Sequence, residues 1–274
     1  MKTSRRNFLK LTGFSALGFG TTTAAMVAPI ATWKAQAQIF GLPSNIKFTS
    51  NDKELKAKHW AIVIDTRKFE DPVLFNKVIK ACHSIHNVPN IVDADDMPTK
   101  NQVKWLWTDD YAASFPDNPS HYLPEAVKKR RFLLLCNHCE QPPCVRVCPT
   151  KATYKRKSDG VVLMDYHRCI GCRFCMAACP FGARSFNFGD PRAYIAETNP
   201  EFPTRMQGVV EKCTFCAERL AIGKLPACVE ASGGAIVFGD LENNKSEIRQ
   251  TLRENFAIRR KPSLGTQPSV YYII

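Results

Sequence analysis

The placement of its cysteines constrains the fold of this chain more than any other feature. Of 12 cysteines in 274 residues, eleven fall between Cys136 and Cys228. A free buried cysteine packs like a small apolar residue and has no reason to cluster, so this crowding indicates metal or disulfide bonding. The chain must therefore bring its thiols to a few shared points.

Two cysteine motifs stand close together in the middle of the chain. The first has the spacing Cys-x2-Cys-x4-Cys-x3-Cys-Pro, and the second has Cys-x2-Cys-x2-Cys-x3-Cys-Pro, the run of bacterial ferredoxins. In such runs three thiolates hold one 4Fe-4S cluster and the fourth reaches a neighbouring cluster. This reciprocal rule predicts two sets of ligands. The first set is Cys136, Cys139, Cys144 and Cys179, and the second set is Cys169, Cys172, Cys175 and Cys148.

A third motif, Cys213-x2-Cys216-x11-Cys228, has Ser232 where a fourth cysteine would follow. A three-cysteine site holding 3Fe-4S, or a cluster with a serine ligand, would account for this pattern. The reciprocal rule favours a ligand from another motif, and Cys82 is the one cysteine left unassigned. We therefore predict a third set, made of Cys213, Cys216, Cys228 and Cys82, and three 4Fe-4S clusters in all.

The residues before Cys82 explain why Ser232 is not a cysteine. A fourth cluster would need three further cysteines in that segment, where the chain instead has Phe69, Pro72, Phe75 and Val78. The loop cysteines and the reciprocal cysteine are thus missing together, as expected if one whole cluster is absent.

Two other uses of the cysteines compete with iron-sulfur clusters. Zinc sites place two separated Cys-x2-Cys pairs around one ion, rather than four thiols in one short run followed by proline. A disulfide scaffold suits an exported protein with an even number of cysteines. However, the export signal at the amino terminus is of a kind that usually carries folded proteins, with their cofactors already bound, out of a reducing cytosol.

The first 37 residues form a predicted twin-arginine signal peptide. Ser4 to Lys10 matches the export pattern around Arg5-Arg6, an uncharged stretch runs from Leu11 to Trp33, and Ala35-Gln36-Ala37 is a cleavage site. The uncharged stretch reaches spanning length, so a retained amino-terminal anchor stays open as an alternative. No second candidate span follows it.

The net charge argues against nucleic-acid binding. Five of the 38 basic residues lie in the signal, which has no acidic residue, so the rest of the chain has 33 basic against 25 acidic residues, or +8. Each oxidised cluster with four thiolates brings about −2, so three clusters leave a charge of roughly +2. We therefore expect no nucleic-acid partner.

Apolar patterns around the motifs predict short strands and helices. We expect strands at Trp60–Ile64 and Ala235–Phe238, a helix that starts at Asp71-Pro72 and carries Cys82, and a helix capped by Ser246 that runs through Phe256. The aromatic segment from Asn90 to Pro124 is assigned to packing or to a partner surface.

The predicted fold class is α+β, with two ferredoxin-like βαββαβ modules built from interleaved motifs and a core that depends on the clusters. The domain boundaries that we expect are a signal at 1–37, a linker at 38–59, a ferredoxin-like 4Fe-4S domain at 60–240, and a carboxy-terminal helix and docking tail at 241–274.

Other polar residues give weaker signals. Four histidines stand beside cysteines, namely His83, His86, His138 and His167, and we interpret them as surface residues or as residues hydrogen-bonded near the ligands. The basic run Lys128 to Arg131 is interpreted as a solvated face, with an anionic lipid or a partner as the alternative. We found no nucleophile-base pair and therefore predict no catalytic residue.

The motifs resemble the four-cluster iron-sulfur subunits that accompany molybdoenzymes and quinone-reactive membrane subunits. In that family the first motif pairs with the fourth and the second with the third, which agrees with the pairing inferred for Cys82. The resemblance covers Ile64 to Asp240 and rests on the segments Ile64–Lys68, Cys136–Glu140, Cys169–Arg173, Glu211–Cys216 and Pro226–Glu230.

Within this family the chain is most similar to the DsrO type, the periplasmic iron-sulfur subunits of the Dsr membrane complex of dissimilatory sulfur metabolism. That resemblance rests on the twin-arginine signal, the degenerate motif before Cys82, Trp105–Thr108, and the ending Arg259–Pro262 with Tyr271-Tyr272.

The resemblance implies a non-enzymatic electron carrier, periplasmic and peripheral to the membrane. Its partners would be an NrfD-like integral quinone-interacting subunit and a periplasmic multihaem cytochrome c. Two rival functions stay open, namely the electron-transfer subunit of an exported molybdopterin oxidoreductase and a zinc-stabilised binding protein. A missing cluster shortens the electron path, which disfavours the first rival.

Overall fold

The computed structural model of the protein describes residues 51–69, 71–95, 97–119 and 122–274, so the predicted signal and most of the predicted linker lie outside the described residues. The helices are α3 (Pro72–Ile85), α4 (Tyr111–Ser114), α5 (Glu125–Lys129), α6 (Pro143–Arg146), α7 (Phe174–Ala177), α8 (Ala217–Ala221), α9 (Ala227–Ala231) and α10 (Glu247–Glu254). The strands are β1 (Trp60–Asp65), β2 (Leu106–Asp109), β3 (Phe132–Leu135), β4 (Thr153–Lys155), β5 (Val162–Met164), β6 (Ser185–Phe186), β7 (Val210–Glu211), β8 (Ile236–Asp240), β9 (Ala257–Ile258) and β10 (Val270–Ile273).

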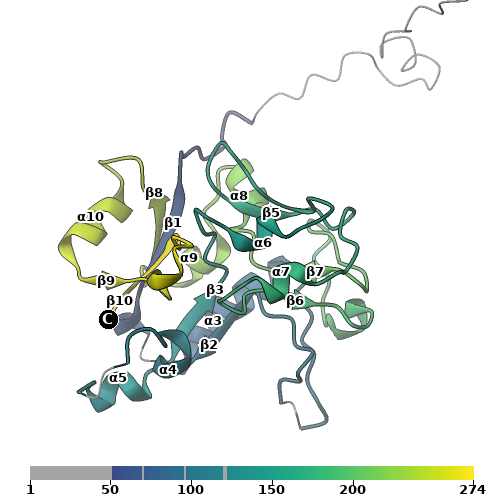
Figure 1. Ribbon diagram of the computed structural model, residues 1–274, viewed down its shortest axis with the longest axis horizontal. Helices are drawn as coiled ribbons and strands as arrows, with labels where there is room; N and C mark the ends of the chain where they lie inside the picture. Colours follow the sequence, from purple (N-terminus) through teal and green to yellow (C-terminus); the bar gives the residue numbers. More distant parts are fainter. Residues whose placement is uncertain (1–50, 70, 96, 120–121) are drawn as a thin grey trace, which may run out of the picture. The chain divides into compact units, whose positions relative to one another are not determined.

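A four-stranded sheet joins segments from both ends of the described chain (Figure 1). Its strand order is β8-β1-β10-β9, with β8 antiparallel to β1 and β10 parallel to β1. Ile62 in β1 lies between Phe238 of β8 and Val270 of β10. Because β1 is covered on both faces, its sequence is a continuous apolar run rather than an alternating one. The two predicted strands are therefore confirmed, and the apolar tail pairs with this chain's own sheet.

Helix α3 is confirmed where the sequence placed it. The Asp71 carboxylate accepts a hydrogen bond from the Val73 N–H group at 2.8 Å, and Pro72 occupies the first turn, where no N–H donor is needed. Phe75, Val78 and Cys82 form its buried face. This face packs against α9 and β2, so α3 carries Cys82 into the interior.

Helix α10 is confirmed at its start but ends earlier than predicted. Ser246 occupies the N-cap position, yet its hydroxyl donates to the Asp240 carbonyl at 2.7 Å instead of capping a helix amide. The helix ends at Glu254, and the chain turns into β9. Phe256 was predicted on the apolar stripe and is instead 81% exposed, because it lies beyond the helix end; the buried residue of this helix is Ile248.

Among the described residues, three two-stranded antiparallel pairs lie outside the main sheet, namely β2-β3, β4-β5 and β6-β7. Together with the short helices they confirm an α+β, ferredoxin-like architecture with many buried cysteines. No helix in the described ranges is both long and apolar enough to cross a lipid bilayer. The described end of the linker packs on the domain, where the Leu55 N–H group donates to the Leu220 carbonyl at 3.0 Å.

Candidate metal centres

The three Cys-x2-Cys loops share an unusual backbone geometry. The residue before the second cysteine has a positive φ in each loop: 40° at His138, 69° at Gly171 and 54° at Phe215. This left-handed turn curls each loop around a point that both cysteines can face. Gly171 is required, because an added Cβ would lie 2.5 Å from the Gly208 carbonyl oxygen. The rings of His138 and Phe215 stack at 3.6 Å, which packs two of these turns against each other.

The first set surrounds one cavity at the end of β3. All four of its thiols line this cavity, together with Arg184. Cys136 directly follows β3, Cys144 lies in α6, and Cys179 comes two residues after α7. The structure thus brings together four cysteines from the two ferredoxin-type motifs, as the reciprocal rule required.

The second set surrounds a neighbouring cavity, lined by Cys148, Cys169, Cys172 and Cys175. Cys172 is solvent-exposed, so this cavity lies at the protein surface. Burial would raise the pKa of Cys148, but hydrogen bonds from Thr153 and Thr150 outweigh it and lower that pKa. The Thr153 N–H group donates to the Cys148 Sγ atom at 3.4 Å.

The third set lies deepest in the protein. Its four cysteines are between 2% and 5% exposed. Burial raises the pKa of Cys82, and the neighbouring thiolates of Cys216, Cys213 and Cys228 raise it further. Such mutual repulsion shows that the four sulfur atoms lie close together, because α3 packs against α9. The structure therefore brings Cys82 to the third motif.

Ser232 lies at the end of α9 and has a structural role in the described chain. Its hydroxyl donates to the Val229 carbonyl at 2.7 Å and accepts from the Ile236 N–H group at 3.1 Å. These two bonds use its donor and one of its lone pairs, and they join α9 to β8. Ser232 is therefore a link between two elements of the fold.

Arg184 is a buried cation between the first and second sets. It is 5% exposed, and its guanidinium donates to the Thr153 Oγ1 atom at 3.1 Å. Burial lowers its pKa, but the thiolates of Cys144, Cys175 and Cys136 outweigh this effect and raise it. Because these cysteines come from both sets, the Arg184 charge faces both cavities.

Lys212 is a second buried cation, between the first and third sets. Its ammonium group donates to the Cys213 carbonyl at 2.7 Å and to the Val162 carbonyl. Burial lowers its pKa, while the thiolates of Cys136 and Cys213 oppose that change. Lys212 had no predicted role beyond a motif position, and Arg184 was missed. Their places, directly before Cys213 and five residues after Cys179, are the signal that could have found them.

The histidines near the cysteines differ in their surroundings. His138 accepts from the Val162 N–H group at its Nδ1 atom (3.1 Å), so its Nε2 carries the proton and donates to the Cys213 carbonyl (3.1 Å). Burial holds the pKa of His138 well below its usual value. His86 lies between the Cys82 carbonyl and the Glu218 carboxylate, each at 2.7 Å.

The remaining two histidines lie in less specific surroundings. Burial lowers the pKa of His83 to about 4. His167 is exposed. His83, His86 and His138 are therefore the histidines that the fold encloses near the predicted ligands.

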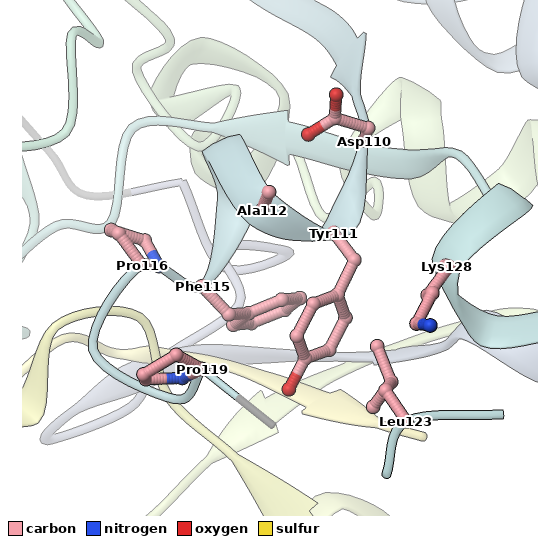
Figure 2. A pocket seen from close by; sticks show the side chains of 8 residues that line it. All are labelled: Asp110, Tyr111, Ala112, Phe115, Pro116, Pro119, Leu123 and Lys128. Atoms are coloured by element: carbon pink, nitrogen blue, oxygen red, sulfur yellow. The ribbon is translucent and has the colours of Figure 1, made fainter. Parts of the chain in front are cut away.

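The aromatic segment before β3 forms a separate pocket that includes no cysteine among its described lining residues (Figure 2). Tyr111 and Phe115 lie ring against ring at its centre, 5.3 Å apart, and both pack on Phe132. Trp105 is fully buried, whereas Tyr122 is 96% exposed. Most of these aromatics thus pack inside the protein, as the first interpretation expected.

The thiol groups fit 4Fe-4S clusters. None of the twelve cysteines, all of which are described, forms a disulfide. Burial and the neighbouring Cys136 raise the pKa of Cys139 to about 12, and burial raises that of Cys228 to about 12. Groups of four such thiols ionise together at neutral pH only beside strong positive charge, which the irons of a cluster supply. Three groups of four match three clusters with four ligands each.

Comparisons with known proteins agree with this chemistry. Residues 129–191 match the 4Fe-4S dicluster domain family. The chain is 40% identical to the Hdr-like menaquinol oxidoreductase iron-sulfur subunit 1 of Archaeoglobus fulgidus, over 98% of this chain and 97% of that protein. It is 34% identical to the iron-sulfur cluster-binding subunit of menaquinone reductase of Nitratidesulfovibrio vulgaris, over 82% and 91%. It is 32% identical to a subunit of the selenate reductase of Mesobacillus selenatarsenatis, over 99% and 97%.

Proposed function

We propose a function that starts from family membership: the chain belongs to the 4Fe-4S dicluster iron-sulfur subunits of menaquinol oxidoreductases and molybdoenzymes, and it is an electron-transfer subunit of a redox complex. The observation that carries the proposal is the gathering of all twelve cysteines into three groups of four. We assign the first, second and third sets as the ligands of three 4Fe-4S clusters. Each cluster would take up and give back one electron at a time.

The protein's own residues define the order of this relay. Arg184 faces the first and second sets, and Lys212 faces the first and third sets. The first set therefore lies between the other two. The second set reaches the surface at Cys172, whereas the third set is enclosed by α3, α9 and the loop after β7. The fold excludes water from the inner clusters and leaves one end of the relay accessible to a partner.

The relay that we favour is the DsrO type, in which the chain passes electrons between an NrfD-like quinone-interacting membrane subunit and a periplasmic multihaem cytochrome c. Two of the relatives bear names that refer to menaquinol or menaquinone, which supports a quinone-linked partner. The Arg5-Arg6 signal supports export to the periplasm, and association with the membrane would come through the partner subunits.

A second candidate is the electron-transfer subunit of an exported molybdopterin oxidoreductase. The similarity to the selenate reductase subunit, over nearly the whole length of both chains, favours it. The zinc-stabilised binding protein has no such support, because family and site both point to iron.

Two measurements test the proposal. Iron and sulfide analysis of anaerobically reconstituted protein should give about twelve irons per chain, and zinc without iron would contradict it. Mass spectrometry of the subunits that co-purify with the chain should find a multihaem cytochrome and an integral quinone-linked subunit. A large molybdopterin subunit would instead select the second candidate.

A further inference from the structure

A groove runs along α3 on the side where the fourth cluster is missing. Its floor is formed by Pro72, Phe75 and Ile79 of the helix. Pro72 and Phe75 stand at positions where a motif ending at Cys82 would have cysteines. The groove therefore lies over the part of the fold in which apolar side chains replace cluster ligands.

The rim of this groove is cationic. Three of its described lining residues, Lys129, Arg130 and Arg131, are basic, and none of the described lining residues is acidic. Arg130 donates to the Thr66 hydroxyl at 3.1 Å and Arg131 to the Thr108 carbonyl at 2.9 Å, and both acceptors are uncharged. The described hydrogen bonds and ion pairs include none from Lys129. The rim thus keeps its positive charge.

Acidic residues near the rim are already engaged. Glu125 pairs with Lys128 at 2.7 Å, and the Asp71 carboxylate caps α3. Neither compensates the three basic side chains of the groove. A partner with acidic side chains around an apolar contact would complement this surface.

Helix α3 connects the groove to the third set. Phe75, Val78 and Cys82 share its buried face. With a rise of about 1.5 Å per residue, the seven residues from Phe75 to Cys82 span roughly 10 Å. A cofactor held against the groove would therefore lie close to the cluster that Cys82 is proposed to ligate.

We propose that this groove is the docking site of an acidic one-electron redox protein, such as a haem protein, which exchanges electrons with the cluster of the third set in place of the missing fourth cluster. The proposal rests on the proposed relay function. In each transfer the cluster of the third set loses one electron, and the ferric haem of the partner gains it and becomes ferrous. A small groove with a charged rim fits the brief, salt-sensitive encounters of electron carriers.

The test uses the full chain with its clusters reconstituted and reduced, mixed with the acidic soluble domain of cytochrome b5 in a stopped-flow instrument at low salt. The double substitution Lys129→Glu and Arg131→Glu should slow haem reduction by about tenfold or more. The uncharged substitution Asn76→Trp, at an exposed residue that lines the groove, should slow it by filling the site.

The matched control is Lys58→Glu with Lys157→Glu, which changes the net charge equally at two exposed lysines of another hollow. We expect the control rate to stay within about twofold of the unsubstituted rate. Equal slowing in control and groove variants would overturn the docking site, as would faster electron transfer to a basic cytochrome c than to the acidic protein. Iron analysis before mixing separates the two proposals, because a chain without clusters contradicts the relay itself, whereas a loaded chain with an indifferent groove contradicts the docking site alone.

Discussion

The two cysteine-bearing halves of the protein are built from very different amounts of regular structure. The half with the two ferredoxin-type motifs contains the four-residue helices α6 and α7 and strands of two or three residues. The half with the third set contains the 14-residue helix α3 and the four-stranded sheet (Figure 1). The first half therefore has little apolar core of its own, and its stability must come largely from its metal ligands.

The loss of one cluster accounts for this difference. Phe75 and Val78, at 7% and 0% exposure, lie in the main apolar core at positions where cysteines would hold a fourth cluster. Ser232, the position of the reciprocal ligand, links α9 to β8 instead. Apolar contacts thus replace the stabilisation that a cluster would supply. Four experiments test whether the two halves differ in this way.

Removal of iron should affect the two halves unequally. We expect a chelator to abolish hydrogen-exchange protection in α6, α7 and β4 to β7, because the elements there are too short to persist alone. Strands β1 and β8 should keep part of their protection, since an apolar core surrounds them. Hydrogen-exchange mass spectrometry measures this, and uniform loss of protection would show that both halves depend equally on the clusters.

Restoring the missing cysteines should not restore the fourth cluster. The quadruple variant Pro72→Cys, Phe75→Cys, Val78→Cys and Ser232→Cys should still bind about twelve irons, because α3 is a continuous helix without the left-handed turns of the other loops. Its free energy of unfolding should fall by roughly 3–6 kcal/mol from the lost core side chains.

Iron analysis and denaturant unfolding measure both effects. The double variant Phe75→Ala, Val78→Ala is the control and should lose similar stability. Sixteen irons in the quadruple variant would mean that the helix rearranges readily into a cluster loop.

Cys82→Ser and Ser232→Ala should separate a ligand from a structural link. We expect Cys82→Ser to change the electron paramagnetic resonance signal of one cluster, with oxygen ligation or conversion to 3Fe-4S, while the other two clusters keep theirs. Ser232→Ala should leave about twelve irons and cost about 1 kcal/mol of stability, since two hydrogen bonds of its hydroxyl are lost. The reverse pattern would make Ser232 the fourth ligand of the third cluster.

Arg184→Gln and Lys212→Gln should lower reduction potentials without loss of iron. A buried positive charge stabilises a reduced cluster, so its removal lowers the potential of each cluster that it faces by on the order of 100 mV. Arg184→Gln should affect the clusters of the first and second sets, and Lys212→Gln those of the first and third. Redox titration followed by paramagnetic resonance measures this. Arg184→Lys, which keeps the charge, should shift the potentials less, and equal shifts of all three clusters would contradict the proposed order.

Local patterns in the sequence predicted much of the fold. The capping carboxylate of Asp71, the proline after it and the apolar spacing through Cys82 are contained in one segment, and they predicted α3. The end of α10 was predicted wrongly, because the chain beyond Glu254 turns to pair with β10, and pairing between distant strands leaves no local signal. The roles of Arg184 and Lys212 could not be predicted for the same reason, since each faces thiols from separate motifs.

The sequence by itself determined the ligand chemistry, because cysteine spacing within a loop decides which thiols can face one cluster. It also determined that the chain lacks the cysteines for a fourth cluster. Only the tertiary structure decided what fills that place, which cations lie between the clusters and which cluster reaches the surface. These features depend on the packing of α3 against α9 and of β1 between β8 and β10, and such contacts join residues far apart in the chain.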